Sequence, residues 1–312
     1  MTMEQPIIQV DGLIKRFAEF TAVDRLSFSV HRGEIFGLVG PDGAGKTATM
    51  RMLAGVMRPN GGAIVIDGVD AVADPEEAKQ HVSYMPQRFG LYEDLTVDEN
   101  IRFYADLFEV PPAIRRERAS RLLAASGMSN FGGFRAGQLS GGMKQKLGVA
   151  CALVHTPKIL LLDEPTTGVD PVSRRDFWRI LYSLREDGVT IVISTAYLDE
   201  AERCNRLTLL HGGRALYCDT PAALKQRMPG KLIAISSSDG RAVRSAISGQ
   251  AGVSQVLLVG DGVHAVVDDA DLRIPRLRDV MQLAGAPFSD IAVASPSIED
   301  VFVALLETGE AR

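Results

Sequence analysis

A glycine-rich segment near the start of the chain has residue types suited to holding phosphate groups. It reads Gly40, Pro41, Asp42, Gly43, Ala44, Gly45, Lys46 and Thr47. This spacing fits G-x-x-x-x-G-K-[ST], in which glycines let successive backbone N–H groups face phosphate oxygens. The lysine would neutralise the β and γ phosphates, and the threonine hydroxyl would reach a Mg²⁺ ion. The segment predicts a nucleotide phosphate site that uses Mg²⁺.

The surroundings of this segment support that prediction. The apolar run Ile35–Val39 before it reads as a strand, and residues 48–54 after it read as a helix, whose N-terminus attracts anions. A glycine-rich turn with a chance Lys-Thr pair is the simpler explanation, but it would not require this context. The motif in this context is typical of P-loop NTPases. We assign ATP contacts to residues 40–48, which include Ala48.

A second pair of glycines lies at the start of another expected helix. The segment is Leu139, Ser140, Gly141, Gly142 and Met143. A serine and two glycines at a helix start expose unpaired N–H groups, which makes an anion site without a lysine. Such a half-site would need a partner to complete it. A plain helix capped by Ser140 is the alternative.

Two adjacent carboxylates follow a buried apolar run. Residues 159–162 are Ile-Leu-Leu-Leu without polar alternation, as expected of a central parallel strand covered on both faces. Asp163 and Glu164 then lie at the carboxyl end of this strand, where α/β sheets bind ligands. Asp163 would hold the Mg²⁺ shell. A merely structural Asp-Glu pair is the alternative.

Taken in order, these segments resemble the ABC ATPase family over about residues 7–225. The resemblance implies that Glu164 is the general base that orients the attacking water. It also implies that residues 139–143 close over the γ-phosphate held by an opposite subunit. The working unit would then be a head-to-tail dimer with two ATP molecules at its interface. Met143 stands where the family more often has glutamine.

Three further positions match the family by order and surroundings. The resemblance implies that Gln87 reaches the Mg²⁺ and the water, that Asp170 lies at the dimer interface, and that Phe17 stacks on adenine. A solvated loop residue is the alternative for Gln87 and Asp170. For Phe17 the alternatives are a core position and a rival aromatic, Phe20.

The loop after residues 190–193 departs from the family pattern. Ala196 stands where the family usually has a histidine that contacts the γ-phosphate, and none of the chain's five histidines lies on this loop. We therefore expect hydrolysis at this chain's own site to be slow. A second ATPase subunit that retains the histidine would compensate, so a heterodimer is favoured and a homodimer is the alternative.

The elements that must position these residues alternate between short apolar runs and helical patterns. This rhythm predicts an α/β fold with a mostly parallel sheet, and the resemblance makes residues 1–225 an ABC-type nucleotide-binding domain of the P-loop NTPases. Residues from about 88 to 153 are mainly helical, which indicates an inserted helical subdomain with one helix at 98–108. A small C-terminal α/β domain is expected over 231–312. Its predicted strands are Lys231–Ser236, Val253–Val259 and 263–267, and its predicted helices are 277–283 and 298–306.

Composition excludes several classes of protein. The 312 residues are 46% hydrophobic and 23% charged, as in ordinary globular proteins, and the net charge of −5 disfavours nucleic acid as a partner. Three cysteines without CxxC spacing suggest neither a disulfide framework nor a zinc site. The chain shows no signal sequence and no apolar run of about 18 residues, so we expect it neither to cross a membrane nor to be exported.

The closing segment, 297–306, resembles the tail of drug-exporter ATPases of the daunorubicin-resistance type. The phosphate loop, together with residues 85–95, resembles the first nucleotide-binding half of bacterial tandem multidrug-efflux ATPases. The resemblance implies an ATP-hydrolysing subunit, peripheral at the cytoplasmic face of the inner membrane, that powers a separately encoded integral-membrane permease for drugs. The alternatives are an ATP-binding regulatory module with little hydrolysis and a soluble ABC ATPase outside transport.

Overall fold

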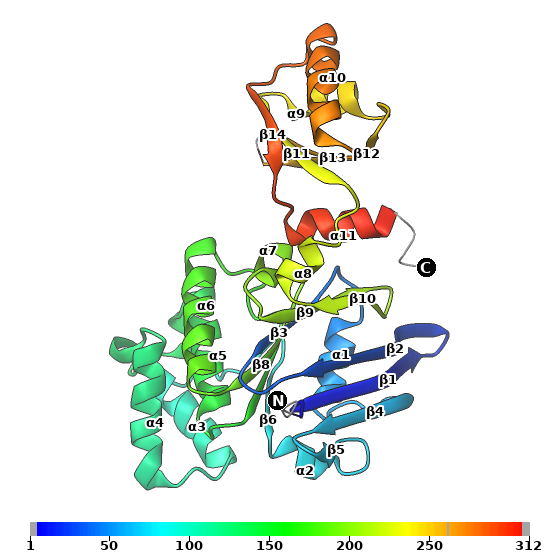
Figure 1. Ribbon diagram of the computed structural model, residues 1–312. Coiled ribbons are helices and arrows are strands. Elements are labelled where there is room, and N and C mark those ends of the chain that lie inside the picture. Colours follow the sequence, from blue (N-terminus) through cyan, green and yellow to red (C-terminus); the bar gives the residue numbers. More distant parts are fainter. Residues whose placement is uncertain (1–4, 261, 308–312) are drawn as a thin grey trace. The chain divides into compact units, whose positions relative to one another are not determined.

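A six-stranded sheet carries the glycine-rich loop. The computed structural model describes residues 5–260 and 262–307, so the outer ends of the two predicted domains lie outside the described residues. The chain divides into two units, one ending at Asp219 and the other beginning at Thr220. In the first unit the strand order is β10-β9-β3-β8-β7-β6, and every pair except β9 with β10 is parallel (Figure 1). The strands are β3 (Ile35–Val39), β6 (Val82–Met85), β7 (Ile159–Asp163), β8 (Thr190–Thr195), β9 (Arg206–His211) and β10 (Arg214–Asp219).

This strand order brings the predicted site residues to one edge of the sheet. Strands β3, β8 and β7 are consecutive neighbours, and every residue in them is buried. Their carboxyl ends lead into Gly40, Ala196 and Glu164. Because parallel strands end at the same edge, the three loops meet there. The α/β fold with a mostly parallel sheet is confirmed.

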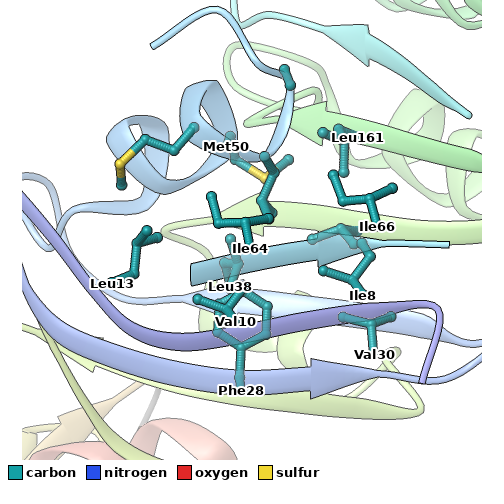
Figure 2. Packing of buried hydrophobic residues seen from close by; sticks show 14 of the residues in the cluster. Ile8, Val10, Leu13, Phe28, Val30, Leu38, Met50, Ile64, Ile66 and Leu161 are labelled. Carbon is teal, nitrogen blue, oxygen red and sulfur yellow. The ribbon is translucent and has the colours of Figure 1, made fainter. Parts of the chain in front are cut away.

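A second sheet of the first unit was not predicted from the sequence. Its order is β2-β1-β4-β5, with antiparallel pairing throughout. Ile8 and Val10 from this sheet pack toward Met50 of helix α1 and Leu38 of β3 (Figure 2). Burying each such side chain contributes about 1.5–3 kcal/mol, so this core fixes α1 beside the main sheet. The elements are β1 (Ile8–Phe17), β2 (Phe20–Val30), β4 (Gly61–Ile66), β5 (Val69–Asp70) and α1 (Lys46–Leu53).

The helices of the first unit include a helical group inside the predicted range 88–153. The longest expected helix there, 98–108, appears as α3 (Val97–Leu107), which begins with a capping box formed by Thr96 and Glu99. A separate apolar core joins α3 to its neighbours. The other helices are α2 (Pro75–Lys79), α4 (Pro112–Ala125), α5 (Gly141–Leu153), α6 (Pro171–Glu186) and α7 (Leu198–Ala201), with 3₁₀ turns at Ser129–Phe131 and Ala136–Gln138.

The second unit is a four-stranded antiparallel sheet, in the order β12-β13-β11-β14, with helices. It contains the three strands and two helices predicted from the sequence, together with β14 and α9, which were not predicted. It begins before the predicted boundary at 225 and 231 because α8 packs against α11. No helix within 5–260 and 262–307 is long and apolar enough to span a membrane. The elements are α8 (Pro221–Lys225), β11 (Lys231–Ser236), α9 (Gly240–Ile247), β12 (Val253–Val259), β13 (Gly262–Val267), α10 (Ala270–Leu283), β14 (Asp290–Ala294) and α11 (Ile298–Glu307).

Candidate functional site

The loop between β3 and α1 has two positions that only glycine can occupy. A Cβ at Gly40 would lie 2.3 Å from the carbonyl oxygen of Leu210, and a Cβ at Gly45 would lie 2.5 Å from that of Ala22. Gly45 also has φ 96° and begins α1 without any side-chain cap on the helix N–H groups. These N–H groups are therefore available to an anion at the positive end of the helix. The cradle fits phosphate oxygens.

Lys46 is buried at the bottom of this loop. Its Nζ donates to the carbonyl oxygens of Gly40 (2.8 Å) and Pro41 (3.0 Å) and pairs with Glu164 Oε1 at 3.0 Å. Only 3% of its side chain is exposed. A buried ammonium requires such partners, because desolvation is costly. Its third partner is the Glu164 carboxylate, so the ammonium already faces an anionic oxygen.

Asp163 accepts hydrogen bonds from three hydroxyl groups. Thr47 Oγ1 (3.1 Å) and Ser194 Oγ (2.6 Å) donate to its Oδ1, and Tyr84 OH donates to its Oδ2 at 3.1 Å. Burial and the neighbouring Asp163 carboxylate raise the pKa of Tyr84, so its hydroxyl stays a donor. The structure thus brings together Thr47 and Asp163, two of the three residues predicted to hold Mg²⁺, which prefers hard oxygen ligands.

Tyr84 and Ser194 were missed from the sequence. Ser194 is the register partner of Asp163 across β7 and β8, and Tyr84 lies in β6 on the other side of β7. A hydroxyl residue at the carboxyl end of a strand could have suggested these contacts. However, the sequence does not show which strands lie beside β7.

Glu164 turns sharply away from the end of β7. Its φ is 47°, a left-handed conformation that costs a non-glycine residue roughly 1–2 kcal/mol. Its N–H donates to Ser194 O (3.1 Å) and Oγ (3.0 Å), which holds this turn. The amide of Gln87 donates to Glu164 Oε2 at 3.2 Å. The predicted catalytic residues Lys46, Gln87 and Glu164 therefore form one contact group.

A cleft of about 660 Å³ opens beside these residues. Phe20, the rival aromatic, lines the cleft, whereas Phe17 is not among its lining residues and lies under Lys15, 5.2 Å from that ammonium. The structure therefore favours Phe20 over Phe17 as an aromatic wall. The lining residues are Phe20, Ala22, Asp42, Gly43, Gly45, Lys46, Thr47, Ala48, Gln87, Glu164, Thr167, Ala196 and Tyr197.

The segment 139–143 and Asp170 are not brought to this cleft. Ser140 caps α5 by accepting from Met143 N at 3.3 Å, and Asp170 caps α6 by accepting from Val172 N and Ser173 N. Hydrogen bonds from Ser173 lower the pKa of Asp170. A Cβ at Gly142 would lie 2.6 Å from Ser173 Cβ, so this glycine allows α5 and α6 to approach closely. Gly141 has no such neighbour and stays open.

The fold and this arrangement are those of an ABC-type ATP-binding domain. Residues 23–167 match the family model described as ABC transporter. Relatives more than 30% identical are matched over nearly their whole length, so the chain belongs to this family. The predicted ABC-type nucleotide-binding fold is confirmed.

Several relatives are named as ATP-binding proteins. The chain is 42% identical over 308 residues to the probable multidrug ABC transporter ATP-binding protein YbhF of Escherichia coli, covering 97% of this chain and 53% of YbhF. It thus spans about half the length of that relative. It is 35% identical to the Nod factor export ATP-binding protein I of Ralstonia nicotianae (96% of this chain, 94% of the relative). It is 32% identical to the daunorubicin resistance ATP-binding protein DrrA2 of Streptomyces coeruleorubidus (97% and 96%).

The fold is also that of a solved structure, an ATP-binding subunit of an ABC transporter. The two are 30% identical with a TM-score of 0.64, over 71% of this chain and 92% of that one. The predicted resemblance to drug-exporter ATP-binding proteins is confirmed by these comparisons.

Proposed function

We propose that this chain binds Mg-ATP in the cleft and hydrolyses it to drive a separately encoded membrane permease. The observation that carries this proposal is the contact group at the cleft. The buried ammonium of Lys46 lies 3.0 Å from the carboxylate of Glu164, which directly follows β7. Phosphate oxygens would take the place of Glu164 as partners of Lys46. Glu164 would then be free to accept a proton from water.

Thr47, Asp163 and Gln87 are the residues that would hold Mg²⁺. The ion would supply positive charge to the β and γ phosphates. Asp163 is held in one orientation by Tyr84 and Ser194, so its carboxylate is preorganised for an oxygen-ligated metal. Gln87, which touches Glu164, would position the water beside the base.

We further propose that residues 139–143 and Asp170 serve the site of a second ATPase subunit. Neither contributes to the chain's own cleft, and Gly141 and Asp170 are exposed. Exposed N–H groups at the start of α5 suit a phosphate supplied from outside. A heterodimer is favoured over a homodimer, because Ala196 lines this chain's cleft without a polar side chain.

Replacing Ala196 with histidine should raise ATP turnover when the purified chain is assayed alone. A donor aimed at developing charge contributes about 10²–10³ in rate at its optimum, and an imidazole at 196 would restore part of that. Ala196→Leu, which fills the same wall without a donor, is the matched control. If the isolated wild-type chain hydrolyses ATP rapidly and Ala196→His does not change that rate, the heterodimer proposal is wrong and a homodimer is the simpler arrangement.

The relatives' names and one exposed surface support a membrane partner. Tyr92 and Phe103 meet edge to face at 4.5 Å, and both are exposed beside the 61% exposed Leu107 of α3. Exposed apolar groups of this kind mark protein contacts. The permease would be a drug or multidrug exporter, and the chain would lie peripherally on the cytoplasmic face of the inner membrane.

Co-expression of the intact chain with permeases encoded beside it tests this proposal. The chain should pellet with membranes only when its permease is present, and ATP turnover should rise with it. A regulatory module, which Ala196 favours, would bind ATP without turnover even in that complex. Association with ribosomes instead of membranes would support a soluble ABC ATPase.

A further inference from the structure

A fully buried carboxylate lies next to the cleft but outside it. Glu200 of α7 is 1% exposed and follows the segment in which Ala196 and Tyr197 line the cleft. Thr195 Oγ1 donates to its Oε2 at 2.8 Å, and Trp178 Nε1 donates to its Oε1 at 3.2 Å. Every oxygen of this buried charge is therefore paired, as burial requires.

Arg174 joins the same carboxylate to helix α6. Its Nε and Nη2 each lie 3.2 Å from Glu200 Oε1, and Nη2 lies 3.3 Å from Asp199 Oδ1. The guanidinium also lies over the ring of Tyr197, 4.2 Å from its centroid. One rigid planar group thus contacts three of the four residues 197–200.

Arg174 is one helical turn from Asp170. Its N–H donates to the carbonyl of Asp170 at 2.9 Å, in the first turn of α6. The side chain of Asp170 caps that turn, and the residue is exposed. A displacement of this end of α6 therefore moves Arg174, whose contacts lead to the wall of the cleft.

We propose that Arg174 and Glu200 form a positioning pair that couples the Asp170 end of α6 to the Ala196–Tyr197 wall of the cleft. The proposal rests on the proposed ATPase function. The methyl group of Ala196 cannot hydrogen-bond a phosphate. The position of this wall therefore depends on the contacts that its neighbouring residues make. Neither Arg174 nor Glu200 lines the cleft, so both act through Tyr197 and Thr195.

The chain provides its own reporter of this pair. Trp178, the only tryptophan, is 1% exposed and hydrogen-bonds Glu200 directly. If nucleotide binding moves the wall, the hydrogen bond of Trp178 changes and its emission shifts. Mg-ATP should therefore produce a saturable change in tryptophan emission in the intact wild-type chain. Lys46→Ala, which removes a phosphate partner, should shift that change to an ATP concentration about 10- to 150-fold higher.

The decisive variant is Arg174→Lys, which keeps the positive charge but loses the planar fork and the stack. It should lose the emission change and lower kcat about tenfold, because a misplaced wall misaligns the reacting groups. Affinity for a fluorescent ATP analogue should stay unchanged. Tyr197→Leu, which removes the ring that lies under the Arg174 guanidinium, should behave as Arg174→Lys. Arg179→Lys, whose guanidinium pairs with Asp176 on the exposed face of α6, is the matched control.

A second variant guards against misfolding. Arg174→Met combined with Glu200→Gln removes both charges together and leaves no unpaired buried carboxylate. It should fold and show the same loss of emission change and kcat. A wild-type chain that binds no ATP would defeat the proposed function itself. Two results would overturn the coupling alone. One is a normal kcat in Arg174→Lys, and the other is a wild-type chain that binds and hydrolyses ATP without any change in Trp178 emission.

Discussion

Replacing Glu164 with glutamine is expected to slow ATP hydrolysis at this chain's own site by about 10²–10⁴-fold, the usual contribution of a general base. The amide cannot accept the proton of the attacking water. ATP binding should persist, since Lys46 loses a competing carboxylate 3.0 Å away and remains available to phosphate. Single-turnover hydrolysis and nucleotide titration of the intact chain, with its second subunit, measure the two quantities separately.

Glu76→Gln is the matched control, because Glu76 lies on the exposed surface of α2, where it pairs with Lys79 in i,i+3 spacing. It should hydrolyse ATP at the wild-type rate. In size exclusion with Mg-ATP, Glu164→Gln should also stay longer in the associated form. An unchanged turnover rate in Glu164→Gln would move the general base to another residue.

Replacing Lys46 with alanine should weaken ATP binding by about 10- to 150-fold, which corresponds to losing about 1.5–3 kcal/mol of charge-assisted contact. Transport should stop with it. The measurement is equilibrium titration with ATP, accompanied by thermal unfolding, since Glu164 loses its ion-pair partner as well. Lys79→Ala removes an exposed lysine and should leave affinity unchanged. Normal binding and hydrolysis by a folded Lys46→Ala chain would refute the phosphate cradle.

The parts of the site that follow from the sequence are those set by local chemistry. The loop 40–47 is recognisable from its sequence because the contacts at positions 40 and 45 admit only glycine, and the phosphate-binding Lys46 directly follows Gly45. Strands β3 and β7 were predicted because continuous apolar runs have one explanation, burial on both faces. Lys46, Thr47, Asp163 and Glu164 accordingly lie together as expected.

The parts that escaped prediction depend on long-range pairing. Ser194 reaches Asp163 only because β8 lies beside β7, and Tyr84 only because β6 lies on the other side. Phe17 and Phe20 are register partners at the end of one hairpin, so the sequence could not say which one lines the cleft. The antiparallel sheet of β1, β2, β4 and β5 was missed for the same reason.

The second unit shows a different limit of sequence patterns. Helix α10 begins at Ala270, well before the predicted start at 277, although Pro275 lies inside it. Proline usually ends a helical pattern, so the first turns were not recognised. Strand β14 is a five-residue edge strand with only Ile291 buried, too short and too exposed for its apolar alternation to stand out.

Amide hydrogen exchange of the intact chain with and without Mg-ATP tests the central claim most directly, because the claim assigns phosphate binding to backbone N–H groups. Mg-ATP should slow exchange in residues 43–48, where the N–H groups at the start of α1 have no side-chain cap. ADP should do so as well. Saturable ATP binding with unchanged exchange in residues 43–48 would contradict the assignment of this cleft as the nucleotide site.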